Sequence, residues 1–119
     1  MEDLTLSTQQ FEMATRFGAV AAPPSLGEKV GISADVWSQE RVLPLNGLRH
    51  PAAAGTSGWF IWCGEEIGAA DDFFIPLHIE HLKARCPEVL PYLALPPGWR
   101  FLLAPGHEDV WFDKTLLAI

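Results

Sequence analysis

Two histidines three residues apart are the side chains in this sequence best suited to hold a metal ion. His78 and His81 stand in the segment LHIEHL, with Glu80 between them. Residues three apart are neighbours on the surface of a helix. Metalloproteases instead space two histidines four apart, with a glutamate directly after the first. We therefore expect no metal site and no cofactor. A small metal-dependent enzyme or metal-binding protein that uses these two histidines and nearby carboxylates is kept as an alternative.

Acidic side chains gather in two short segments that could bind a partner. One follows the apolar run SGWFIWC, and the other follows the sequence PGH near the C-terminal end. Paired carboxylates can act in acid–base catalysis or hold divalent cations, but no adjacent nucleophile or glycine-rich phosphate loop accompanies them. They are interpreted as solvated turns and helix-capping charge, or as an acidic surface for a protein partner. The candidate partner-binding residues are Glu65, Glu66, Asp71, Asp72, Glu108 and Asp109.

Neither the cysteines nor the serines have the surroundings of a catalytic nucleophile. Cys63 lies among aromatic and acidic residues, whereas a reactive thiolate needs electropositive surroundings and a histidine within reach. The run Gly-Thr-Ser-Gly at residues 55–58 lacks the GxSxG pattern of a nucleophile elbow. Cys63 and Cys86 are not in a zinc-binding spacing. We expect two buried free thiols and no catalytic residue.

Tryptophan is the remaining signal, because five tryptophans are many for a chain of 119 residues. Packing in the core is expected to account for most of them. One or two on a surface rimmed by acidic residues would make an anchor for a partner that carries arginine or lysine. The tryptophans are Trp37, Trp59, Trp62, Trp99 and Trp111.

Hydrophobic periodicity predicts the elements that position these residues. One helix is expected at about residues 7–17, with Gly18 as its stop, and a second over FFIPLHIEHLKARC, starting near Pro76. A short helical turn is expected after Pro87. Alternation of apolar and polar residues predicts a half-buried strand at 29–37 with one solvated side. The last predicted elements are two strands at 99–104 and 108–112, joined by a hairpin.

The segments on either side of residue 57 give opposite predictions. SGWFIWC is apolar on both of its faces, which is typical of a central strand. The preceding stretch, residues 38–58, contains Pro44, Asn46-Gly47 and Pro51, so it is predicted to be mostly loop. At most a short extended piece is expected there, at residues 41–45. Together these elements predict one α+β domain over residues 1–119, with a mainly antiparallel sheet of four to five strands and two principal helices.

Composition and charge exclude several classes of partner. Fifteen acidic residues against eight basic ones give a net charge of −7, which argues against binding of nucleic acid or of an anionic membrane surface. The N-terminal segment lacks the basic and apolar regions of a signal peptide, and no apolar run reaches the length of a membrane span. A cytoplasmic protein is therefore expected.

The sequence resembles the small bacterial immunity proteins of the thirty-third immunity family of polymorphic toxin systems, long catalogued as a domain of unknown function. The resemblance runs from about Val30 to the C-terminal end, so the predicted helix at 7–17 lies outside its clearest part. The motifs that carry it are Gly58-Trp59, Gly64-Glu65, Asp72-Phe73-Phe74, LPPGWRF at residues 95–101 and EDVW at residues 108–111.

This resemblance implies neutralisation of a cognate toxin by a non-catalytic binding protein, and it brings no catalytic or binding residues with it. We expect stoichiometric binding of a basic protein toxin through the acidic candidates above. A housekeeping homo-oligomer whose exposed aromatic residues pair with themselves is a further alternative, and the oligomeric state stays open.

Overall fold

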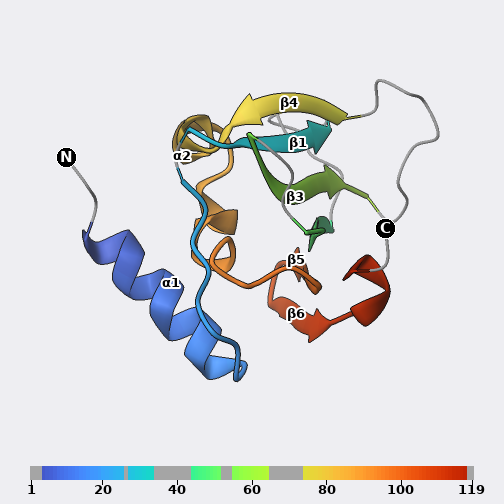
Figure 1. Cartoon of the computed structure of the whole chain (residues 1–119). Coiled ribbons are helices and arrows are strands. Elements are labelled where there is room, and N and C mark those ends of the chain that lie inside the picture. Colours follow the sequence, from blue (N-terminus) through green and yellow to red (C-terminus); the bar gives the residue numbers. More distant parts are fainter. Residues whose placement is uncertain (1–3, 26, 34–43, 52–54, 65–73, 118–119) are drawn as a thin grey trace.

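Six strands form one sheet in the computed structural model, which describes residues 4–25, 27–33, 44–51, 55–64 and 74–117 (Figure 1). The sheet order is β4-β1-β3-β2-β5-β6, and every neighbouring pair is antiparallel except β1 with β3. The expected α+β class is confirmed, but the sheet has six strands instead of four to five, with one main helix instead of two. The strands are β1 (Lys29–Ser33), β2 (Leu45–Arg49), β3 (Thr56–Cys63), β4 (Phe74–His78), β5 (Trp99–Ala104) and β6 (His107–Phe112).

The main helix, α1 (Leu4–Arg16), ends where the sequence predicts. Gly18 has a φ of 74°, and the amides of Gly18 and Ala19 donate to the carbonyls of Thr15 and Ala14 at 3.0 and 2.8 Å. A glycine in this left-handed conformation closes a helix at little steric cost. α1 does not lie directly on the sheet: it packs on the 3₁₀ helix η3 (Pro87–Tyr92), which lies between them (Figure 1).

β3 is the central strand that SGWFIWC predicts. It pairs with β1 on one side and β2 on the other, and six of its eight residues are buried. Side chains alternate between the faces of a strand. Trp59, Ile61 and Cys63 therefore face the helices, and Phe60 and Trp62 lie on the other side. We call these the helix-side face and the opposite face.

The prediction of a loop before residue 57 is wrong, because β2 lies there as a fully buried strand between β3 and β5. Asn46-Gly47 suggested a turn. Instead, the Asn46 side-chain amide donates to the carbonyls of Pro44 and Gly64, at 3.2 and 2.6 Å. Gly47 lies beneath the ring of Phe101, where a Cβ atom would come within 2.3 Å of that ring. The glycine thus serves close packing across the sheet and not a turn.

The predicted second helix is largely wrong. Residues 74–78 form edge strand β4, followed by the one-turn elements η2 (Ile79–His81) and α2 (Leu82–Arg85). Pro76 has no N–H and is tolerated in an edge strand, where one side of the backbone needs no partner. Ile79, Leu82 and Cys86 are buried, as apolar residues of a helix would be, but Ile75 is 44% exposed.

The remaining local predictions are confirmed in their main features. Pro87 begins η3, and β5 and β6 form the predicted hairpin through Pro105 and Gly106. β1 is half-buried as expected, but Ser33, on its supposedly solvated side, is 1% exposed. The predicted continuation of β1 through residues 34–37, including Trp37, lies outside the described residues. So does the first part, 41–43, of the extended piece predicted at 41–45.

Apolar side chains form one cluster on each face of the sheet. The larger, on the helix-side face, includes Trp59, Ile61 and Phe101, together with residues of η2, α2 and η3. The smaller, on the opposite face, joins Leu48 and Trp62 to Leu116 of the 3₁₀ helix η4 (Lys114–Leu117). Both cysteines are buried and neither is in a disulfide, as predicted. Within the described ranges, no helix combines the length and the apolar character that crossing a membrane requires.

Candidate functional site

β6 lies at one edge of the sheet (Figure 1), and its sequence HEDVWF contains both acidic and aromatic residues. The register with β5 sets the direction of each side chain: Val110 lies opposite Phe101, and Trp111 lies opposite Arg100. Residues 108, 110 and 112 therefore lie on the helix-side face, and residues 107, 109 and 111 on the opposite face. We call this strand with its side chains the β6 surface.

Glu108 joins three elements instead of standing free as a binding carboxylate. Its Oε1 lies 2.8 Å from Nη2 of Arg16, at the end of α1, and its Oε2 accepts a hydrogen bond from the Tyr92 hydroxyl of η3. The Glu108 side chain is 27% exposed. Much of its charge is thus balanced within the chain, which makes Glu108 a tie between α1, η3 and β6.

The pKa of Tyr92, whose hydroxyl donates to Glu108, is a measure of whether this tie is formed. Burial, the hydrogen bond to Glu108 and the negative charge of Glu108 raise the pKa of Tyr92 well above its ordinary value. An unfolded tyrosine loses its proton near pH 10. The folded chain keeps the proton above that pH, so the free energy of unfolding should fall from there upward, by at most about 1.4 kcal/mol per pH unit for one proton.

We expect the ultraviolet absorbance of tyrosinate to appear only well above pH 10 in the folded chain, and near pH 10 in urea. Tyr92 is the chain's single tyrosine, so the signal has one source. Glu108→Gln keeps the shape of the side chain but removes the negative charge, and should move the folded midpoint down. A folded midpoint at the ordinary value would contradict the tie.

Asp109 is the more accessible carboxylate of the pair. Its side chain is 57% exposed and lies on the opposite face, 2.9 Å from Nε2 of His107, which is itself 54% exposed. More than half of the Asp109 side chain therefore stays open to a partner. Glu108 and Asp109, adjacent in sequence, therefore do not form one acidic patch.

Trp111 stands beside Asp109 on the same face of β6 and is 38% exposed. The guanidinium of Arg100 lies 5.3 Å from its ring centroid, and Arg100 also pairs with Asp113 at 3.2 Å. Asp113 accepts hydrogen bonds from the hydroxyl and the amide of Thr115; these bonds and Arg100 lower its pKa. The Trp111 ring is thus fixed from below by Arg100, with part of its surface open.

Phe112 is the second exposed aromatic residue of the β6 surface, at 50%. It lies on the helix-side face, where its ring meets Trp99 edge-on at 5.9 Å. Gly98 lies beneath it: a Cβ atom there would come within 2.5 Å of the Phe112 ring. Asp109, Trp111 and Phe112 give the strand one exposed acid and two exposed aromatic rings.

The four other acidic candidates, Glu65, Glu66, Asp71 and Asp72, lie outside the described residues. Of the tryptophans, Trp59 and Trp62 are buried, Trp99 is partly buried and Trp111 is exposed. The sequence suggested that one or two tryptophans would be exposed near acids, but could not say which. Phe112 was missed, although the alternating run HEDVWF next to a turn is a usable signal for a partly exposed edge strand.

His78 and His81 lie close together, but not on successive turns of one helix. His78 ends β4, His81 ends η2, and their ring centroids are 5.9 Å apart. They line a hollow of about 270 Å³ together with Lys29, whose positive charge opposes cation binding. Among the described residues, no group of three or more histidine, cysteine, aspartate or glutamate side chains is arranged to hold a metal ion.

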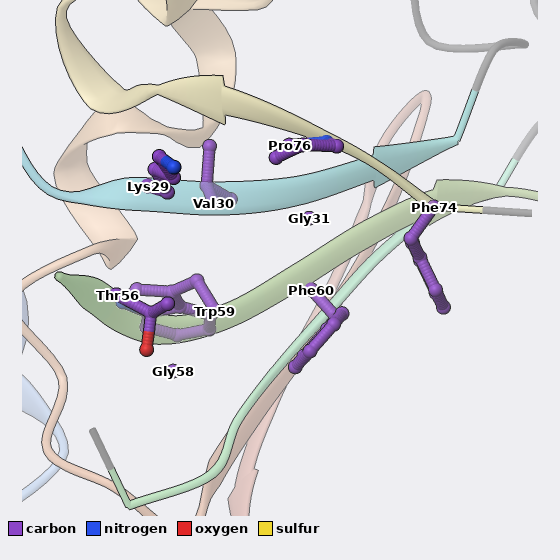
Figure 2. Close-up of a pocket in the computed structure, with 9 residues that line it drawn as sticks. All are labelled: Lys29, Val30, Gly31, Thr56, Gly58, Trp59, Phe60, Phe74 and Pro76. Carbon is purple, nitrogen blue, oxygen red and sulfur yellow. The ribbon is translucent and has the colours of Figure 1, made fainter. Parts of the chain in front are cut away.

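An apolar groove of about 200 Å³ lies between β1, β3 and β4 (Figure 2). The rings of Phe60 and Phe74 extend from β3 and β4 on the same side of the sheet and meet edge-on at 5.0 Å. Trp59 also lines it, and its indole N–H is bonded to the Leu93 carbonyl. Lys29 and Thr56 are the other polar residues of the lining. This lining has no nucleophile paired with a base, which suits contact better than catalysis.

A comparison with protein-family models finds a match to the Imm33-like domain over residues 9–113. The matched range begins inside α1 and reaches past β6, so it covers all six strands of the sheet. This match confirms the resemblance noted in the sequence, but it begins at residue 9 instead of about Val30, so it also includes most of α1. Neither the curated proteins nor the solved structures give a significant match.

Proposed function

The chain belongs to the Imm33-like domain family, and on that premise we propose that it neutralises a cognate bacterial toxin by binding it stoichiometrically. The protein acts without catalysis, as a cover for a functional surface of the toxin. An immunity-type family implies a protein partner in general, and the proposal extends this to a basic toxin.

The observation that carries the choice of surface is the exposure of Trp111 beside Asp109 on one face of β6. Binding hot spots are enriched in tryptophan, and a tryptophan next to an open carboxylate suits an arginine or lysine of the partner. The net charge of −7 adds a long-range attraction for a basic protein. Phe112 extends the apolar contact on the other face of the strand.

The acidic candidates of the sequence enter the proposal at two levels. Asp109 is proposed as a direct contact, because its side chain is more than half exposed. Glu108 is proposed to support the surface indirectly, through Arg16 and Tyr92. Glu65, Glu66, Asp71 and Asp72 are proposed to supply further negative charge for the encounter with the toxin.

The proposal is tested by co-expressing the chain with the protein encoded by the adjacent gene. Cells that produce only the protein encoded by the adjacent gene should stop growing, and cells that also produce the chain should grow. The pair should then co-purify at a fixed ratio. Three results together would show that the proposed function is wrong. The protein encoded by the adjacent gene is not toxic, no toxin-like partner co-purifies from the native host, and a strain that lacks the gene for the chain is fully viable.

Trp111→Ala should weaken the purified complex by about 30-fold in Kd, equivalent to about 2 kcal/mol, as expected for a central aromatic anchor. Titration calorimetry gives the Kd, and a urea unfolding curve shows that the variant is still folded. Phe11→Ala is the matched control: Phe11 is 61% exposed and lies on α1 instead of on β6, so its loss should leave the Kd unchanged. Equal effects of the two substitutions would place the contact elsewhere.

A further inference from the structure

We infer that the outer edge of β6 receives an extended, lysine- or arginine-bearing segment of the partner as a seventh strand of the sheet. The inference rests on the proposed function, because it specifies how the β6 surface would hold the toxin. In this mode the main chain supplies the hydrogen bonds, and side chains on the two faces supply the specificity.

The two edges of the sheet differ in how open they are to another strand. β4 is only five residues long and contains Pro76, which lacks an N–H. β6 has six residues, contains no proline or lysine, and pairs with β5 without a bulge. Prolines, bulges and charged side chains are the usual means by which proteins protect a sheet edge. On β6 the charged side chains are the acidic Glu108 and Asp109, which disfavour an acidic strand but suit a basic one. Among the described residues, β5 is the only strand that pairs with β6.

The register shows which backbone groups of β6 point away from the sheet. A two-residue turn makes Ala104 and His107 a hydrogen-bonded pair, and such pairs recur at every second residue. The bond from the Asp113 amide to the Gly98 carbonyl, at 2.7 Å, fits the same alternation. Residues 107, 109 and 111 therefore bond inward to β5. The N–H and C=O groups of Glu108, Val110 and Phe112 point outward, where a further strand would bond.

Charge favours a basic segment over a second copy of this chain. If two β6 strands paired antiparallel about Val110, the two Asp109 side chains would be diagonal neighbours on one face, about 7–8 Å apart. Each copy would also bring a net charge of −7. A lysine or arginine beside Asp109 instead gains an ion pair, and its aliphatic stem covers the exposed part of Trp111. On the other face, an apolar side chain fits between Val110 and Phe112.

Residue-resolved amide exchange by NMR tests the inference, on the chain alone and in its co-purified complex with the protein encoded by the adjacent gene. The amides of Glu108, Val110 and Phe112 should exchange quickly in the free chain and slow at least about tenfold in the complex. The amides of Asp109 and Trp111 should be protected in both states. Alternation along one strand is the signature of strand addition, since a contact through side chains alone would not protect every second amide.

A pair of variants at Val110 separates the contribution of the backbone N–H to binding from that of the side chain. Val110→Pro removes an outward N–H but no inward bond, so the fold should persist while the Kd of the complex rises about tenfold. Val110→Thr keeps the N–H and nearly the same shape, and should bind within about threefold of the natural chain. Urea unfolding confirms that both variants fold, and the exchange pattern of the natural chain tests the inference independently of either.

The outcomes distinguish a failure of strand addition from a failure of toxin binding itself. A complex that forms while residues 108, 110 and 112 stay unprotected overturns strand addition and leaves toxin binding standing. Protection of these amides in the free chain that grows with its concentration overturns the basic segment in favour of a second copy. If no complex forms and no growth is rescued, both proposals are overturned.

Discussion

Replacing Arg49 with alanine is expected to destabilise the fold by about 4 kcal/mol, because the substitution removes a buried cation that bonds to several segments at once. Arg49 lies on β2 and is 5% exposed. Its Nε donates to the Ser57 carbonyl at 2.9 Å, and its Nη1 donates to the carbonyls of Ala22 and Leu95 at 2.7 and 2.8 Å. A third bond from Nη1, to the Leu93 carbonyl, is 3.3 Å long.

These bonds explain why the chain retains a buried cation. Arg49 ties β2 to β3, to the segment that follows α1 and to the segment that follows η3. Within the described residues it has no salt bridge, so carbonyl dipoles and the face of Trp59, 5.7 Å away, balance its charge. Burial lowers the pKa of Arg49, and the charge of Glu28 partly opposes this. Alanine would leave buried carbonyls without donors and a cavity beside Trp59.

Urea unfolding of three variants separates the hydrogen bonds from the charge. Arg49→Lys keeps the charge but loses the several N–H donors of the guanidinium group. Its free energy of unfolding should therefore lie between those of the natural chain and of Arg49→Ala. Arg16→Ala removes an exposed cation, whose side chain is 58% exposed, and should cost less than about 1 kcal/mol. A loss below about 1 kcal/mol for Arg49→Ala would show that these bonds do not hold the segments together.

Gly47→Ala should cost about 3 kcal/mol or prevent folding, because the added methyl group enters the ring of Phe101. Its Cβ would lie 2.3 Å from two ring carbons. The ring has little room to move: it is 1% exposed, stacks on Tyr92 at 5.0 Å and meets Trp59 at 5.6 Å. Urea unfolding measures the loss of stability.

Gly27→Ala is the matched control for Gly47→Ala. A Cβ at Gly27 would meet nothing within 4 Å, and its backbone does not have a positive φ, so this substitution should change stability by less than about 0.5 kcal/mol. Phe101→Leu, combined with Gly47→Ala, should restore part of the loss, because the two sites share one contact. Additive losses would contradict the proposed clash.

The sequence predicted correctly those elements whose conformation is favoured by their own residues, whatever the rest of the chain packs against them. α1 ends at a glycine that adopts a positive φ, β3 is apolar on both faces, and β5 and β6 are joined by Pro105-Gly106. In each case the signal lies within the element or directly beside it. The acidic and aromatic character of the β6 strand was visible in the same way.

Gly47 and Pro76 were misread because their roles depend on distant partners. Gly47 is in a strand since Phe101, more than fifty residues away, occupies the space of its side chain. Pro76 is in a strand since β4 forms an edge of the sheet, where a missing N–H costs little. When only neighbours in the sequence are considered, Gly47 after Asn46 indicates a turn, and Pro76 indicates the start of a helix.

The composition of the candidate site is already visible in the sequence: an acidic pair, a tryptophan and a phenylalanine within six residues, in a chain of net charge −7. Which of these side chains can meet a partner depends on the fold. Because side chains alternate across a strand, Glu108 points toward Tyr92 and Arg16, while Asp109 points to the opposite face. Because β6 is the last strand of the sheet, Trp111 and Phe112 stay partly exposed, whereas the equally aromatic β3 is buried between two neighbours.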